Sequence, residues 1–210
     1  PPPERDAERG EYLTDAPAPG YREQPDEVVH VEARADGHVD AEEDDQEEVQ
    51  EHPGRAPEEA ADAIRTGDGQ GVKIAVIDSG VDPTHPELEG LTLADDVAIL
   101  RYISRFRVVE GTAKDAFGHG TAVAGIIRRI APKAQIGSFR VLGEGLTSRS
   151  DLVAEGVRQA IDRGYHIINC SFGCRGDQKF IMSYKSWVDE AYLSGTHIVA
   201  ACNNQDFSIP

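Results

Sequence analysis

Four short runs of β-branched and apolar residues constrain the fold of this chain more than any other feature. The runs are Val72–Ile77, Gln135–Val141, Tyr165–Cys170 and His197–Cys202. Runs of this length and composition are typical of strands that are buried on both faces of a sheet. The sequence therefore predicts a sheet with strands at these four positions.

Helical patterns separate these runs. In each, apolar residues recur on one helical face, and we expect Ser150 as the N-cap of the first helix and Gly164 and Gly195 as stops. The apolar face of the first helix consists of Leu152, Val153, Val157, Ala160 and Ile161. That of the second consists of Phe180, Tyr184, Trp187, Val188 and Ala191. Alternation of strand and helix at this spacing predicts an α/β fold: a three-layer, mostly parallel β-sheet with helices on both faces and ligand chemistry at the carboxyl ends of the strands.

The first 66 residues differ in charge from the rest. They contain 21 Asp and Glu against 6 Lys and Arg (net −15), whereas residues 67–210 contain 17 against 15 (net −2). Large apolar residues are few there, with Val28, Val29 and Val31 as the only strand-like hint, so we expect residues 1–66 to be a disordered acidic leader before a domain at 67–210. The stretch at 36–51 holds nine carboxylates, which favours a solvated tail over a specific binding arm.

Composition also excludes several classes of partner. An acidic chain repels phosphate, so we do not expect nucleic acid binding, and no apolar run is long enough for a membrane span. No signal peptide pattern opens the chain at Pro1. The cysteines Cys170, Cys174 and Cys202 do not form a metal-ligand pattern, and buried free thiols are favoured over a disulfide.

Polar residues follow several of the predicted strands. Asp78 follows the first, Ser171 the third and Asn203–Asn204 the fourth, so we expect them at one edge of the sheet. His119 lies between two glycines where an apolar helix begins. The positive end of a helix disfavours a protonated imidazole, which predicts that His119 starts as a neutral general base.

Four segments carry a resemblance to a known family. In order, VKIAVIDSGVDPTHPEL (72–88), GHGTAVAG (118–125), IINCSFG (167–173) and IVAACNN (198–204) resemble the aspartate, histidine, substrate-strand and oxyanion segments of the subtilisin-like serine proteases (subtilases, peptidase family S8). The resemblance spans Gly71 to the end of the chain, and its first two motifs are highly specific. It implies a serine endopeptidase with a subtilisin-like fold that is incomplete at its C-terminus.

The resemblance also implies roles for individual residues. Asp78 would orient His119, which would act as general base and then as general acid, and Asn204 would donate to the oxyanion. An extended peptide or protein substrate would be the partner. The residues implied to bind it are Gly145, in the loop from Gly143 to Ser148, and Ser171, Phe172 and Gly173.

The chain departs from the family pattern in several places. The family usually has Gly before the oxyanion asparagine, where this chain has Asn203, so either asparagine could donate and we favour Asn204. Only three residues lie between Ile127 and Ala131, so the common calcium loop is not expected, and we identify no cofactor or metal site. None of the ten serines follows Gly-Thr, so the nucleophile of the G-T-S-x-A motif is expected beyond Pro210.

Alternative functions remain open at this level. A catalytically dead, peptide-binding pseudoprotease would also lack the nucleophile. A dinucleotide site is disfavoured because Gly67, Gly69 and Gly71 precede the first strand, whereas a phosphate-binding fingerprint must follow it. A metal hydrolase is disfavoured because no H-E-x-x-H or comparable ligand set is present. Secretion is the location that the resemblance implies by default.

Overall fold

In the computed structural model of the chain, the first apolar run forms strand β4 (Lys73–Asp78), which has a parallel neighbour on each side. The structure describes residues 57–102, 105–173 and 181–201, together with three short strands before them. Ala75 and Ile77 enter one hydrophobic core, whereas Val76 enters a second core. Strand β4 is therefore buried on both faces, as its composition predicts.

The main sheet has eight strands in the order β1-β2-β6-β5-β7-β4-β9-β10. Within this order, β5, β7, β4, β9 and β10 pair in parallel. Strands β6, β2 and β1 add an antiparallel edge beside β5. The mostly parallel sheet that the sequence predicts is confirmed. The bounds of the strands beside β4 are Arg5–Asp6 (β1), Glu11–Thr14 (β2), Asp96–Tyr102 (β5), Arg105–Glu110 (β6), Gln135–Arg140 (β7), Ile167–Cys170 (β9) and His197–Ala200 (β10).

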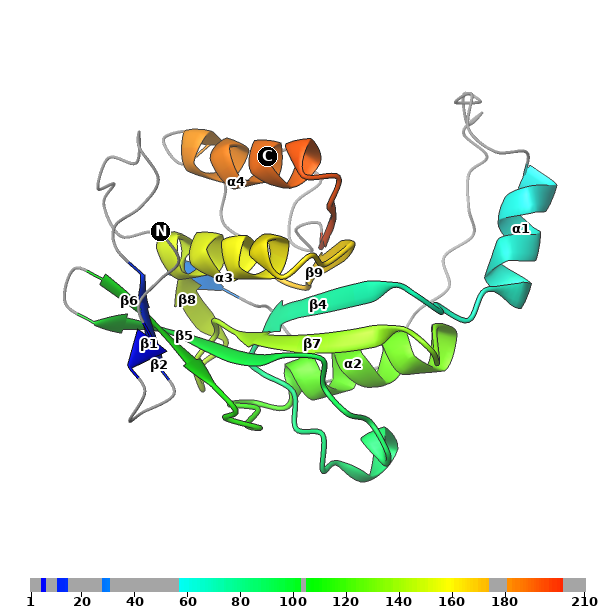
Figure 1. Cartoon of the computed structure of the whole chain (residues 1–210), viewed down its shortest axis with the longest axis horizontal. Coiled ribbons are helices and arrows are strands. Elements are labelled where there is room, and N and C mark those ends of the chain that lie inside the picture. The colour runs from blue at the N-terminus through cyan, green and yellow to red at the C-terminus, as the bar shows by residue number, and fades with distance from the viewer. Residues whose placement is uncertain are drawn as a thin grey trace, which may run out of the picture.

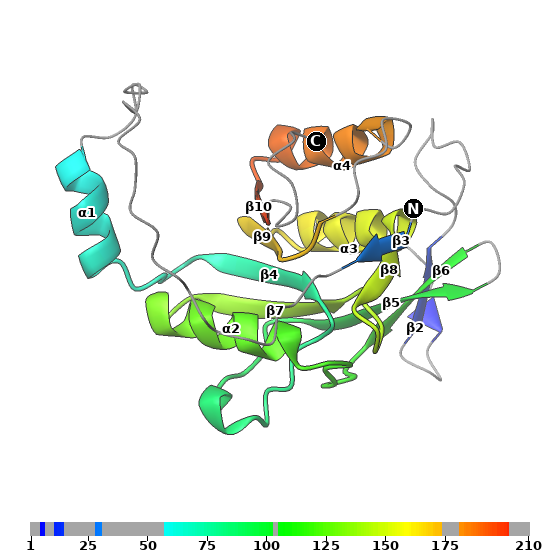
Figure 2. The ribbon, with the colours of Figure 1, turned by 180° about the vertical axis from the view of Figure 1, so that it is seen from behind.

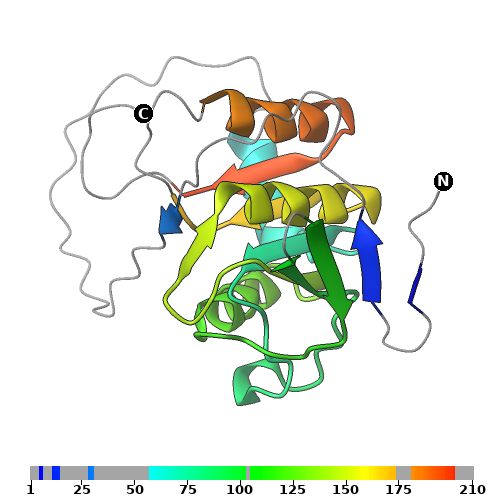
Figure 3. The same ribbon diagram turned by 90° about the vertical axis from the view of Figure 1, so that its left-hand side faces the viewer.

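Helices cover both faces of this sheet. Helix α2 (His119–Ile130) lies on one face, and α3 (Ser150–Asp162) and α4 (Ile181–Leu193) lie on the other (Figures 1 and 3). From β4 the chain passes through η1 to β5, turns back as β6 and reaches β7 through α2. It then crosses past β4 to β9 through α3, on the face opposite α2 (Figure 1).

The larger core fills the space between the sheet and helices α3 and α4. It includes Val153 and Val157 of α3, Trp187 of α4 and Phe139 of β7. The Phe139 ring packs edge-on against Tyr165, with 5.2 Å between the ring centroids. This packing fixes the carboxyl ends of β4, β7 and β9, where the polar residues lie.

Two details differ from the sequence prediction. Helix α3 begins at Ser150 itself, so Arg149 and not Ser150 is its N-cap, whereas Gly164 has a φ of +70° just after the helix and ends it as expected. The hairpin of β5 and β6 was missed, because the strands mix apolar residues with exposed arginines and do not form uniformly apolar runs.

Parts of the acidic leader are described and have regular structure. Residues Pro57–Thr66 form helix α1; this segment is rich in the helix formers Ala and Glu and has Pro at its first position. Strand β3 (Val28–His30) pairs antiparallel with β8 (Thr147–Arg149), as Figure 2 shows. The acidic stretch at 36–51 lies outside the described residues.

A short 3₁₀ helix, η1 (Pro86–Leu88), lies in the connection between β4 and β5. Among the helices that the structure describes, none has the length and apolar character needed to cross a membrane.

Candidate active site

The site begins with Asp78, the last residue of the central strand β4. Its carboxylate is fully buried, and the Ser79 backbone N–H donates to its Oδ1 at 2.7 Å. A buried carboxylate requires such partners because an unpaired buried charge is costly. The position at the carboxyl end of the central strand aims Asp78 at the edge where the sequence predicts chemistry.

His119 reaches this carboxylate from the first turn of α2. Its Nδ1 lies 2.9 Å from both Oδ1 and Oδ2 of Asp78. A carboxylate can only accept hydrogen bonds, so this contact places the proton of a neutral imidazole on Nδ1 and leaves Nε2 as the acceptor. The His119 side chain is 22% exposed, so the ring remains accessible to a reacting group.

Two glycines allow the aspartate and histidine segments to approach so closely. A Cβ on Gly120 would lie 2.1 Å from the Gly80 carbonyl oxygen and 3.1 Å from Asp78 Cβ. A Cβ on Gly80, whose φ is +108°, would lie 2.1 Å from the Lys114 carbonyl oxygen. Both distances are much shorter than a van der Waals contact. The backbone at Gly80 therefore lies directly against the backbone at Gly120 and at Lys114, with no room for a side chain.

Asp115 holds the loop that carries His119. Its Oδ1 accepts from the Ser79 hydroxyl at 2.7 Å and from the backbone N–H groups of Phe117 and Gly118, at 2.9 and 2.7 Å. Its Oδ2 accepts from both the N–H and the hydroxyl of Thr121. A carboxylate at the start of a helix satisfies donors that the helix leaves free.

The role of Asp115 was not predicted from the sequence. The available signal was an aspartate placed shortly before the first turn of an apolar helix, which is a common capping arrangement. Burial raises the pKa of Asp115, but the hydrogen bonds from Thr121, Ser79, Gly118 and Phe117 outweigh it, and the pKa is lowered overall. At a pH equal to the ordinary pKa of an Asp carboxyl group, Asp115 is therefore mostly ionised.

The pKa of His119 is shifted in the direction opposite to the one that the sequence predicts. The hydrogen bond that His119 donates to Asp78 raises the pKa of His119; burial lowers it, and the charges of Asp78 and Asp115 raise it further, so the pKa is raised overall. The expected lowering by the helix N-terminus is therefore wrong in net effect. The carboxylate lies in direct contact with the ring and dominates the weaker dipole.

Other predicted site residues lie at the same edge of the sheet. Ser171 and the buried Phe172 follow β9 directly, and the Asn169 side-chain amide donates to the Ser171 hydroxyl at 2.7 Å. Gly173 has open space around its Cβ position. Gly145 lies in the exposed loop after β7. The predicted oxyanion residue Asn204 lies outside the described residues, as does Asn203.

Among the described residues, neither the cysteine nor a group of metal-ligating side chains adds to this geometry. Cys170 is a buried free thiol, and burial, followed by the charge of Asp78, raises its pKa to about 12. It is therefore inert at neutral pH. Cys174 and Cys202 lie outside the described residues. Across the described residues, His, Cys, Asp and Glu side chains form no group of three or more that could hold a metal ion.

The fold agrees with comparisons to known proteins. The model of the subtilase family matches residues 69–210, and the chain belongs to that family. The subtilase serine protease fold is thus shown for the part of the chain that holds Asp78 and His119.

Several relatives and solved structures are similar to the chain. The minor extracellular protease Epr of Bacillus subtilis (strain 168) is 33% identical over 145 residues, which is 65% of this chain and 20% of that protein. Thermitase of Thermoactinomyces vulgaris is 30% identical over 162 residues, covering 72% and 54%. The structure of sphericase has a TM-score of 0.57 and 30% identity, covering 68% and 49%. The chain thus spans about half or less of the length of these relatives.

Proposed function

We propose that this chain supplies the aspartate and histidine of a serine endopeptidase. The observation that carries the proposal is the contact of His119 Nδ1 with both oxygens of the buried Asp78 carboxylate, at 2.9 Å. A histidine oriented in this way is the general base that activates a serine hydroxyl in acyl transfer. The proposed substrate is a peptide or protein in extended conformation.

Each residue has a distinct role in the proposed reaction. Asp78 accepts a hydrogen bond from the Nδ1–H of His119 and stabilises the imidazolium that forms when Nε2 takes the proton of the attacking serine. His119 then returns that proton to the leaving amine, so the proton count balances over acylation. Asn204 is proposed to donate to the oxyanion. The nucleophilic serine is proposed to lie beyond Pro210, in a G-T-S-x-A motif.

The surroundings of the pair support this chemistry. Asp115 and Ser79 fix the segments on both sides of the pair without competing for the ring. Ser171, Phe172 and Gly173 are proposed to pair with the substrate backbone on one side, and the loop that contains Gly145 on the other.

A covalent probe tests the proposal. The full reading frame that contains this chain is expressed, and the protein is treated with a fluorophosphonate, which labels an activated serine. We expect labelling at a G-T-S serine, and we expect the His119→Ala variant to lose it. A folded full-length protein that remains unlabelled would instead be a pseudoprotease that keeps the peptide-binding residues without the nucleophile.

The polypeptide Pro1–Pro210 gives a second test. Because none of its serines follows Gly-Thr, we propose that it hydrolyses no peptide bond by itself. We also propose that it is only marginally stable, since β10 is the last strand of the described sheet and its Val199 is 55% exposed. Cleavage of casein by the purified polypeptide would contradict the proposed location of the nucleophile.

A further inference from the structure

The first turn of α2, which carries His119, is not capped by the residue in its N-cap position. That residue is Gly118, which has no side chain to accept a hydrogen bond and has a φ of +107°, a conformation that favours glycine. The start of a helix leaves backbone N–H groups without partners inside the helix, and an N-cap side chain usually accepts from the second or third of them. The acceptors for this turn must therefore come from elsewhere in the fold.

Two side chains outside the helix supply these acceptors. Ser79, which directly follows β4, accepts from the Gly120 N–H through its Oγ at 3.1 Å. Asp115 accepts from the Thr121 N–H through its Oδ2 at 2.9 Å. Gly120 and Thr121 are the second and third residues of α2, the two positions that an N-cap side chain serves. Ser79 and Asp115 together replace the missing cap.

The proton of the Ser79 hydroxyl is donated to Asp115. Ser79 is fully buried, and its Oγ lies 2.7 Å from Asp115 Oδ1. Although burial raises the pKa of Asp115, the hydrogen bonds that it accepts lower the pKa overall and keep the carboxyl group ionised. An ionised carboxylate can only accept, so the hydroxyl donates to Asp115 and its lone pairs remain free for Gly120. The hydrogen bonds thus run in one direction, from Gly120 through Ser79 to Asp115, and such a chain strengthens its own members.

Ser79 also contacts the other member of the Asp78–His119 pair. Its backbone N–H donates to Asp78 Oδ1 at 2.7 Å, and it directly follows Asp78 in the chain. Gly120 directly follows His119, so the bond between Gly120 and Ser79 links the backbones that carry the two members of the pair. Loss of this bond would allow the first turn of α2 to shift relative to the end of β4.

We propose that Ser79 is a positioning residue of the Asp78–His119 pair: its hydroxyl caps α2 from the end of β4 and holds the imidazole of His119 against Asp78. For catalysis, as distinct from the contact itself, this rests on the proposed function. Ser79 does not touch a substrate in this role, because its hydroxyl is buried and bonded to Asp115. Its effect reaches the reaction only through the orientation of His119.

Titration of the His119 ring by NMR tests the proposal on this chain, without a nucleophile. In Ser79→Ala, we expect the pKa of His119 to fall toward the ordinary value of histidine, because the hydrogen bond to Asp78 that raises it is weakened. Ser138→Ala is the matched control, since Ser138 is also fully buried and its hydroxyl oxygen accepts the Val81 N–H at 3.0 Å. Ser138 makes no hydrogen bond with either member of the pair in the described part of the chain, so its removal should leave the titration unchanged.

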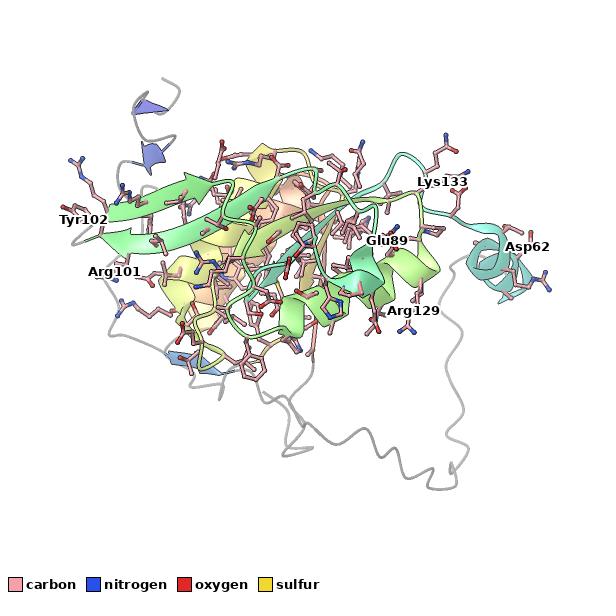
Figure 4. All side chains as sticks on the ribbon, turned by 90° about the horizontal axis from the view of Figure 1, so that it is seen from below. Asp62, Glu89, Arg101, Tyr102, Arg129 and Lys133 are labelled. Carbon is pink, nitrogen blue, oxygen red and sulfur yellow. The ribbon has the colours of Figure 1, made fainter. Side chains whose placement is uncertain are left out.

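The outcomes separate a positioning role from a purely structural one. Both hydroxyls accept a buried backbone N–H, so both alanine variants should lose stability in urea, while only Ser79→Ala should shift the His119 titration. Arg129→Gln, in the exposed last turn of α2 (Figure 4), is a second control that should leave the titration unchanged. An unchanged titration in Ser79→Ala, or an equal shift in Ser138→Ala, would overturn the proposal. If Ser79→Ala does not fold, Ser79→Cys gives the same reading, because its sulfur bonds only weakly, and the absence of a shift there would overturn the proposal.

Kinetics of the full-length protein separate this proposal from the proposed function. With a fluorogenic casein substrate, we expect Ser79→Ala to lower kcat about tenfold and to change KM less than about twofold, because a misplaced base impairs the reaction and not the binding of substrate. Ser138→Ala should leave both constants within about twofold of the wild type. An unchanged kcat in Ser79→Ala would overturn the positioning role and leave the peptidase intact. A shifted His119 titration in a protein that hydrolyses no casein would overturn the peptidase and leave the positioning role intact.

Discussion

Two neighbouring regions at the same edge of the sheet differ in how far their polar groups are satisfied. Around the Asp78–His119 pair, Asp78 contacts His119 and the Ser79 N–H, and Asp115 accepts from side chains and backbone on both sides. Where the ends of β5, β7 and β8 meet, Arg140 Nε is buried without a partner among the described residues. The comparison separates a region whose polar groups are satisfied within the protein from one that contains an unsatisfied buried donor.

The largest expected effect comes from forcing apart the two segments that carry Asp78 and His119. In Gly120→Ala, the new Cβ meets the Gly80 carbonyl oxygen, which belongs to rigid backbone. We expect a loss of about 3 kcal/mol in the free energy of unfolding, measured with urea. Gly143→Ala is the control, because its Cβ would have only the Thr147 carbonyl oxygen nearby, at 3.9 Å. Equal costs for the two variants would show that the close approach is not required.

Removal of the Asp115 carboxylate should have the next largest effect. Asp115→Ala leaves the donors of Ser79, Gly118 and Thr121 without their acceptor, and we expect a loss of about 2 kcal/mol. Because the Asp115 pKa is lowered, its contribution is present above the ordinary pKa of Asp and is lost as the pH falls through the lowered value. Asp68→Ala, which removes an exposed ion pair with Lys133, serves as control and should cost less than about 1 kcal/mol.

The pH dependence of stability tests the contact between Asp78 and His119. The pKa of His119 is raised, first by its hydrogen bond with Asp78. Protonated His119 therefore stabilises the fold fully below the ordinary pKa of histidine, and this contribution is lost as the pH rises through the raised pKa. Urea unfolding across this range should show the loss in the wild-type chain and a smaller loss in Asp78→Asn. Identical pH profiles would contradict the coupling.

The smallest expected effect concerns Arg140 and has the opposite sign. Arg140→Met replaces a buried donor that lacks a partner by an apolar group, and we expect the free energy of unfolding to rise by about 1 kcal/mol. The exposed control Arg129→Met should change it by less than about 0.5 kcal/mol. A loss of stability in Arg140→Met would mean that the side chain is already satisfied.

The sequence was most informative where pattern and position coincide. The apolar runs predicted β4, β7 and β9, because buried strands carry uninterrupted apolar residues, and they also predicted β10, which lies at the edge of the described sheet and is largely exposed. The two specific motifs singled out Asp78 and His119, which the structure brings into contact. In both cases the information lies within a few consecutive residues.

Features that depend on how distant segments of the chain pair could not be predicted in this way. Arg101, Arg140 and Arg149 are distant in sequence, and they share a pocket only because β5 pairs with β7 and β8 follows in the same corner. The raised pKa of His119 likewise depends on its contact with Asp78 at 2.9 Å, whose effect is larger than that of the helix N-terminus. The sequence indicates neither the pairing nor the distance.

The tautomer of the His119 ring tests the central claim most directly, and it can be measured on this chain without a nucleophile. At a pH above the raised pKa of His119, the ¹⁵N chemical shifts of the ring distinguish a proton on Nδ1 from a proton on Nε2. Because the Asp78 carboxylate can only accept a hydrogen bond, we predict that the proton is on Nδ1 and that Asp78→Ala removes this preference. A neutral ring protonated on Nε2 in the wild-type chain would contradict the proposed general base.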